Sequence, residues 1–207
     1  MSIHIAEVGF PHMHGHSLTG IESKSGTEGI QTPRLVIFES GGEYEVHHRN
    51  YSKRARAAAA QIYVGNIYQP DTLQDLPEIG LLVLKNVITD PSCAEKIWEG
   101  LLVLLDSKIV AGGIVLFIDY ILRGTAATLE SLKVVIAQNP RFAIVLDQAQ
   151  HASDQLAKPE VWSSDTDIIQ LLLANLEHIA VVDEALRRGL STLNTSNKQL
   201  LVLQARS

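Results

Sequence analysis

Two stretches of the sequence consist almost entirely of apolar residues, "IGLLVLKNVI" at 79–88 and "IVLFIDYI" at 114–121. A strand with one face in water alternates apolar and polar side chains, whereas these runs offer no polar face. They therefore predict strands of a parallel sheet that is covered on both sides. Consecutive parallel strands need a long crossover between them, usually a helix, and this requirement constrains the rest of the chain.

The remaining segments meet that requirement. Shorter runs rich in β-branched residues predict five more strands, at 3–9, 34–40, 61–67, 178–185 and 198–206. Apolar residues at helical spacing predict intervening helices, at 52–60, 90–107, 129–136 and 165–176. The run "RFAIVLDQ" at 141–148 fits either element, and the spacing of Phe142, Val145 and Leu146 favours a helix.

The order of these elements predicts the fold class. Strands alternate with helices through most of the chain and end in a strand–loop–strand unit, which indicates an α/β fold with a mostly parallel sheet and an antiparallel C-terminal edge. The 207 residues show no linker, so we expect a single domain over 1–207. Ligands of such sheets bind at the carboxyl ends of the strands.

Composition narrows the classes of partner. A formal net charge of −6 disfavours binding to a nucleic-acid backbone, which draws on clustered Lys and Arg. No stretch approaches the roughly eighteen apolar residues of a membrane span. Cys93 is the only cysteine, so no intrachain disulfide can form. We therefore expect a cytoplasmic protein without a nucleic-acid or membrane partner.

Histidines alternate in the segment that follows the first predicted strand, "EVGFPHMHGHS" at 7–17. On an extended chain His12, His14 and His16 face one side, where neutral imidazoles can chelate a divalent metal. This pattern leaves a metal-dependent hydrolase open as an alternative function. No neighbouring Asp completes a metal motif, so we assign no metal ligands and consider His14 and His16 as general bases instead.

The strand ends provide candidate binding residues. Gly9 and Gly15 lie in the first turn after a strand, where the backbone must approach a ligand. Glu39 ends the second predicted strand directly before two glycines and is suited to bind ribose hydroxyls. Asp119 and Tyr120 end the strand at 114–121, from which side chains can reach a substrate pocket.

At this point the chain resembles the class I S-adenosylmethionine-dependent methyltransferases along nearly its whole length. The resemblance lies in the order of its segments, which are "AEVGF", "VIFES", "VGNIYQPD", "LLVLKNVI", "KIWEGLLVLLDSKIVAGGIVLFIDY", "DIIQLLLANLEHIAVVDEA" and "KQLLVLQAR". It implies a Rossmann-like three-layer sandwich with a seven-stranded sheet whose last strand is antiparallel. It also implies methyl transfer from S-adenosylmethionine to a small molecule.

The resemblance implies roles for individual residues. Glu7 and Gly9 would hold the methionine end of S-adenosylmethionine, and Glu39 would hold its ribose. The adenine and flanking positions would be Asn66, Ile67, Lys85 and Asn86.

The chain also departs from the family pattern. Phe10 to Met13 stand where the family usually has further glycines, and their bulk favours a second alternative, a non-catalytic binding or scaffold protein. The chain begins directly on its first strand, so we expect a substrate pocket that is either more open or completed by residues 123–162 or by a second subunit. Residues 123–162 are thus a candidate substrate cap, and a homodimer is left open.

Overall fold

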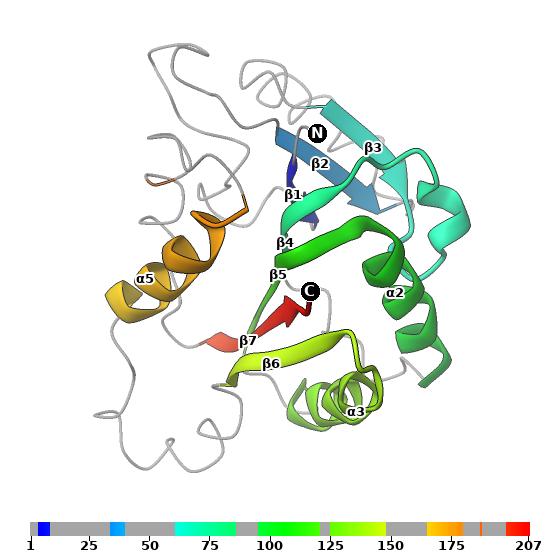
Figure 1. Ribbon diagram of the computed structural model, residues 1–207. Coiled ribbons are helices and arrows are strands. Elements are labelled where there is room, and N and C mark those ends of the chain that lie inside the picture. The colour runs from blue at the N-terminus through cyan, green and yellow to red at the C-terminus, as the bar shows by residue number, and fades with distance from the viewer. Residues whose placement is uncertain are drawn as a thin grey trace.

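The computed structural model describes residues 4–8, 34–39, 61–85, 95–120, 125–147, 165–179, 187 and 198–207. These residues form a central twisted sheet with helices on both faces (Figure 1). Helices α2 (Glu95–Lys108) and α3 (Thr125–Gln138) lie on one face, and helix α5 (Asp165–Leu176) lies on the other. The mixed α/β architecture predicted from the sequence is confirmed.

The seven described strands form one sheet, with the order β3-β2-β1-β4-β5-β7-β6. Their bounds are β1 His4–Val8, β2 Arg34–Glu39, β3 Gln61–Gly65, β4 Ile79–Lys85, β5 Ile109–Tyr120, β6 Phe142–Asp147 and β7 Lys198–Ala205. Strand β7 runs antiparallel to both of its neighbours, whereas β1 to β5 pair in parallel. Strand β1 lies between β2 and β4. The chain adds β2 and β3 on one side of β1 and then crosses to add β4 and β5 on the other side.

The apolar runs of β4 and β5 are buried on both faces, as predicted. In β4, Leu82 and Leu84 belong to the core beneath α2 and α3, and Leu81 and Val83 belong to the core beneath α5. No side chain in these two pairs is more than 1 % exposed. Each helical layer therefore has its own apolar core, and the central strands separate the two cores.

Strand β5 begins earlier than the sequence predicted. It starts at Ile109 and passes through Gly112, whose φ of 75° is favourable only for glycine. A β-carbon on Gly113 would lie 2.8 Å from the carbonyl oxygen of Val110. The Gly112–Gly113 pair therefore forms an irregular step inside the strand.

The helix favoured at 141–148 is wrong, because residues 142–147 form strand β6. This strand pairs with β7, with Phe142 opposite Ala205 and a register shift between Ile144 and Leu146. Its backbone hydrogen bonds come from a strand far along the chain, which the local spacing of apolar residues does not reveal. Residues 178–179, the start of another predicted strand, lie in the turn after α5, and 180–185 lie outside the described residues.

Other sequence predictions have mixed outcomes. Helices α3 and α5 confirm the predictions at 129–136 and 165–176. Helix α2 confirms the predicted helix from residue 95 onward, whereas its start near residue 90 and the predicted helix at 52–60 lie outside the described residues. Within the candidate cap 123–162, α3 and β6 belong to the layered body and the remainder is mostly outside the described residues.

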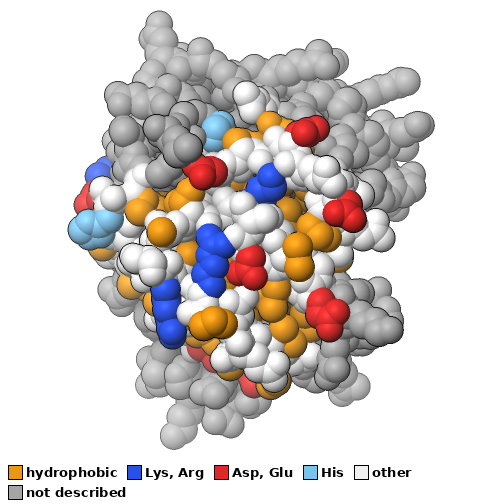
Figure 2. Space-filling model, turned by 45° about the vertical axis from the view of Figure 1, so that its right-hand side comes forward, with side chains coloured by type: hydrophobic (Ala, Val, Ile, Leu, Met, Phe, Trp, Pro, Cys, Tyr) orange, Lys and Arg blue, Asp and Glu red, His pale blue; other side chains and the backbone are white. Residues whose placement is uncertain are grey.

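Figure 2 shows one side of the molecule, where acidic and basic side chains are both present and apolar ones lie between them. Two valines of the helical layer are exposed, Val103 of α2 at 54 % and Val134 of α3 at 58 %. Single apolar residues of this kind are common on protein surfaces. Among the described helices, none has the length and apolar character needed to cross a lipid bilayer.

Candidate functional site

The carboxyl ends of β1 to β5 meet at one edge of the sheet because these strands are parallel. The register places Val8 of β1 opposite Ile37 of β2 and opposite Leu84 of β4. Glu39 ends β2 opposite Gly65, the last residue of β3, and Lys85 ends β4 opposite Ile118 of β5. This edge, between β1 and its two neighbours, is where ligands of doubly wound sheets bind.

Several residues predicted from the sequence lie at this edge. Glu7 is the penultimate residue of β1 and pairs with Val36 and Val83. Asp119 and Tyr120 are the last two residues of β5. The topology therefore brings Glu7, Glu39, Lys85, Asp119 and Tyr120 to the same end of adjacent strands.

Asn66 begins a tight turn directly after β3. Its side-chain Oδ1 accepts a hydrogen bond from the backbone N–H of Tyr68 at 2.9 Å, and its carbonyl accepts one from the N–H of Gln69 at 2.9 Å. Its own N–H donates to the hydroxyl of Thr72 at 2.8 Å. Asparagine commonly starts such a turn by bonding the backbone two residues on.

Ile67 does not present its side chain at the edge. The residue is 0 % exposed and belongs to the core beneath α2 and α3. Any contact of Ile67 with a ligand would therefore come from its backbone. Asn66 is half-buried, so its side chain is the accessible polar group of this pair.

Helix α2 packs closely against the turn. A β-carbon on Gly100 would lie 2.0 Å from the carbonyl oxygen of Tyr68, so the backbone of the turn occupies the space of a side chain. The rings of Tyr68 and Trp98 meet edge-on, with centroids 6.1 Å apart and planes at 69°. Trp98 is 0 % exposed, and its Nε1 has no acceptor among the described residues.

The same segment is fixed at its other end. After the turn, helix η1 (Pro70–Leu73) leads toward β4, and the Lys108 ammonium at the end of α2 donates to the carbonyls of Gln74 at 2.5 Å and Leu76 at 2.8 Å. A cation at a helix C-terminus is favourable in itself. Helix α2 thus holds the segment 66–76 at both ends, from the Asn66 turn at the carboxyl end of β3 to Leu76, shortly before β4 begins.

Gly65, Thr72 and Gly100 shape the packing of this segment, and none of them was predicted from the sequence. Their roles depend on contacts between segments that are separate in the sequence. The available signal was Gly100 itself, because a glycine inside an otherwise apolar helix costs stability and usually has a packing reason.

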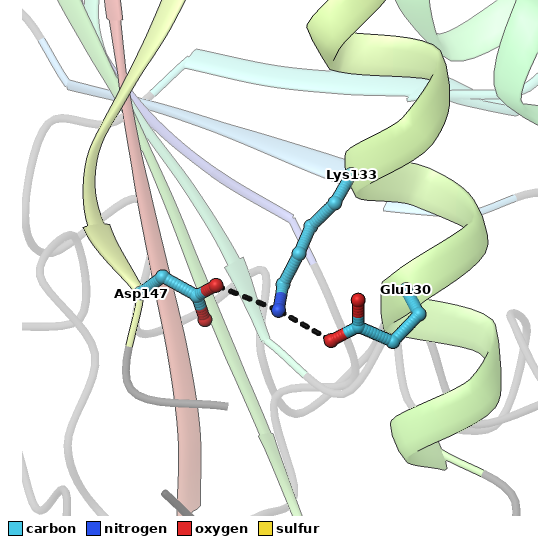
Figure 3. A network of polar contacts seen from close by, with 3 residues as sticks. All are labelled: Glu130, Lys133 and Asp147. Carbon is cyan, nitrogen blue, oxygen red and sulfur yellow. Dashed lines mark hydrogen bonds and ion pairs between the residues drawn. The ribbon is translucent and has the colours of Figure 1, made fainter. Parts of the chain in front are cut away.

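A charged cluster lies beside β6, at the opposite border of the described sheet from β3, where Lys133 of α3 bridges two acids (Figure 3). Its Nζ lies 2.5 Å from Glu130 Oε1 and 2.6 Å from Asp147 Oδ2. Burial lowers the pKa of Lys133, but hydrogen bonds with Asp147 and Glu130 and the charges of both acids raise it by more. The pKa of Lys133 is therefore above its usual value. The lysine remains charged and connects α3 to β6.

Five predicted site residues lie outside the described residues: Gly9, His14, Gly15, His16 and Asn86. His12 is outside them as well, so the histidine row stays a prediction. Within the described parts of the chain, no group of three or more His, Cys, Asp or Glu side chains could hold a metal ion.

Solved structures share this fold. TrmN from Thermus thermophilus is similar with a TM-score of 0.53 and 11 % identity, over 99 % of this chain and 44 % of TrmN. A loganic acid methyltransferase with SAH has a TM-score of 0.52 and 13 % identity, over 99 % of this chain and 85 % of that one. The chain thus spans less than half the length of TrmN. At the level of fold, the resemblance to class I S-adenosylmethionine-dependent methyltransferases is confirmed.

Sequence comparisons add no relative. No protein-family model matches the chain, and no curated protein matches it.

Proposed function

We propose that this protein binds S-adenosylmethionine at the carboxyl edge of its sheet and transfers the methyl group to a small molecule. One observation carries the proposal. Glu39 ends β2 opposite Gly65, the last residue of β3, and Asn66 follows Gly65 directly. On its other side β2 pairs with β1, which carries Glu7 near its end. Three neighbouring strands therefore deliver two acids and an amide to one edge, a set suited to a nucleoside with a cationic tail.

The residues that we assign to the cofactor suit it in their chemistry. The carboxylate of Glu39 can accept hydrogen bonds from both ribose hydroxyls, and such charge-assisted bonds are the stronger kind. Asn66 and the backbone of Ile67 would contact the adenine. Glu7, with Gly9 and Gly15, would hold the methionine end, and Lys85 and Asn86 would flank the cofactor.

When bound, S-adenosylmethionine supplies an electrophilic methyl group on a sulfonium. The protein must then hold the acceptor in line with that carbon and exclude water from the cation. His14, His16, Asp119 and Tyr120 are the residues we assign to the acceptor side. One of them would receive the proton of an acceptor hydroxyl or amine, which helps the reaction but is not essential to an in-line displacement.

Titration calorimetry tests the proposal. We expect the wild-type protein to bind S-adenosylmethionine and S-adenosylhomocysteine, and Glu39→Ala to lose about tenfold or more in affinity, because a hydrogen bond to a charged group contributes about 1.5–3 kcal/mol. Glu99→Ala, which removes an exposed acid of α2, is the matched control and should bind as the wild type does. A folded wild-type protein that binds neither ligand at ~1 mM would overturn the proposed function.

A further inference from the structure

We infer that Thr72 is a positioning residue, whose hydroxyl holds Asn66 in the orientation that meets the cofactor base. The inference rests on the proposed function. Thr72 belongs to η1, and its Oγ1 lies 2.8 Å from the backbone nitrogen of Asn66, 2.7 Å from the carbonyl oxygen of Gln69 and 3.3 Å from the carbonyl oxygen of Asn66.

The hydroxyl has two roles in the turn. It accepts the hydrogen bond of the Asn66 N–H, and its single proton is best placed on the nearer carbonyl, that of Gln69. Thr72 therefore joins the first residue of the turn to the fourth. A valine has the same shape but can neither donate nor accept these bonds.

The turn in turn fixes the Asn66 amide. The group that faces the Tyr68 N–H must be the acceptor Oδ1, which leaves Nδ2 as a donor. No hydrogen bond of the described residues gives Nδ2 an acceptor. Purine rings carry acceptor nitrogens, so a donor held at this place suits a base.

The hydroxyl is also positioned relative to Glu39. A β-carbon on Gly65 would lie 2.8 Å from Thr72 Oγ1 and 2.6 Å from Leu73 Cδ2, so η1 lies directly over the last residue of β3. Gly65 is the register partner of Glu39. Thr72 thus contacts both the residue proposed for the base and the strand end that pairs with the residue proposed for the ribose.

The test compares Thr72→Val, Thr72→Ser and a control in two ligands. The ligands are S-adenosylhomocysteine and S-ribosylhomocysteine, which is the same molecule without its base. The control is Ser107→Ala, because Ser107 also donates to a backbone carbonyl, that of Leu104 at 3.1 Å, but near the C-terminal end of α2. Affinities come from calorimetry or NMR titration, and thermal unfolding is measured on every variant.

We expect Thr72→Val to lose about tenfold in affinity for S-adenosylhomocysteine and to keep its affinity for S-ribosylhomocysteine. Thr72→Ser should keep the wild-type affinity for S-adenosylhomocysteine, because it retains the hydroxyl. Ser107→Ala should bind both ligands as the wild type does. A general loosening of the fold would weaken both ligands alike, and that result would overturn the positioning role.

The outcomes separate this inference from the proposed function. If the wild type binds S-adenosylhomocysteine and Thr72→Val binds it equally well, only the role of Thr72 is overturned. If the wild type binds neither S-adenosylmethionine nor S-adenosylhomocysteine, the proposed function is overturned and the role of Thr72 falls with it.

Discussion

Helices α2 and α3 lie on the same face of the sheet but are held by different chemistry. Helix α2 contacts the segment 66–76 by close packing, with Gly100 against the Tyr68 carbonyl and Trp98 against the Tyr68 ring. Helix α3 is joined to β6 by Lys133, which pairs with Asp147. The α2 contact depends on Gly100 having no side chain, whereas the α3 contact depends on opposite charges. A larger side chain should therefore disrupt the first contact, and a change of pH should weaken the second.

The largest effect should come from adding volume to the α2 contact. In Gly100→Val the β-carbon alone would lie 2.0 Å from the Tyr68 carbonyl oxygen, so helix or turn must move. We expect a loss of about 3 kcal/mol or more in the free energy of unfolding, as for severe overpacking. Denaturant unfolding measures this loss, with Glu99→Ala on the exposed side of the same helix as the control. A variant as stable as the wild type would show that this contact is not rigid.

Removing the charge of Lys133 should have the next largest effect. Lys133→Met leaves Asp147, whose side chain is 21 % exposed, without this cation, and we expect a loss of about 2 kcal/mol, below the range for fully buried pairs. Glu130→Gln is the comparison, because the Glu130 side chain is 56 % exposed and the expected loss is under about 1 kcal/mol. Equal losses in the two variants would contradict the view that Asp147 is the more important partner.

The smallest effect should appear at alkaline pH. The pKa of Lys133 is raised above its unfolded value of 10.5, so its contribution to stability is complete below about pH 10 and decreases as the pH rises through the folded pKa. The stability difference between wild type and Lys133→Met should therefore be constant from pH 7 to 10 and decrease above pH 10.5. The α2 contact has no such charge, so the difference between wild type and Gly100→Val should stay constant over the same range. A Lys133→Met difference that does not decrease would show that the ammonium charge contributes little.

The fold was largely predictable where the pattern of apolar residues fits only one kind of element. The apolar runs of β4 and β5 required cover on both faces, and the structure gives them that cover. The run at 142–147 was mispredicted because its apolar residues fit either element and their spacing favoured a helix. The pairing with β7 decides between them, and it joins segments that are distant in the sequence.

The candidate site was predictable only in part, for a related reason. Element order is enough to place Glu7, Glu39 and Asn66 at the carboxyl ends of neighbouring strands, because parallel strands end at one edge. The packing of the turn after β3 was not predictable, since Thr72 and Gly100 matter through contacts with Asn66 and Tyr68 across a turn and a helix. The order of elements along the chain follows from local patterns, whereas such contacts require the folded chain.

The register shift in β6 has a consequence for behaviour in concentrated solution. Among the described strands, β6 is the outermost on its side of the sheet, and it exposes Ile144 and Val145 at 38 % each. A straight apolar border strand is a template on which other chains can add and grow into fibrils. The irregularity at these two residues interrupts the evenly spaced row of backbone donors and acceptors that such growth copies. We therefore expect this irregularity to oppose the addition of other chains at the β6 border.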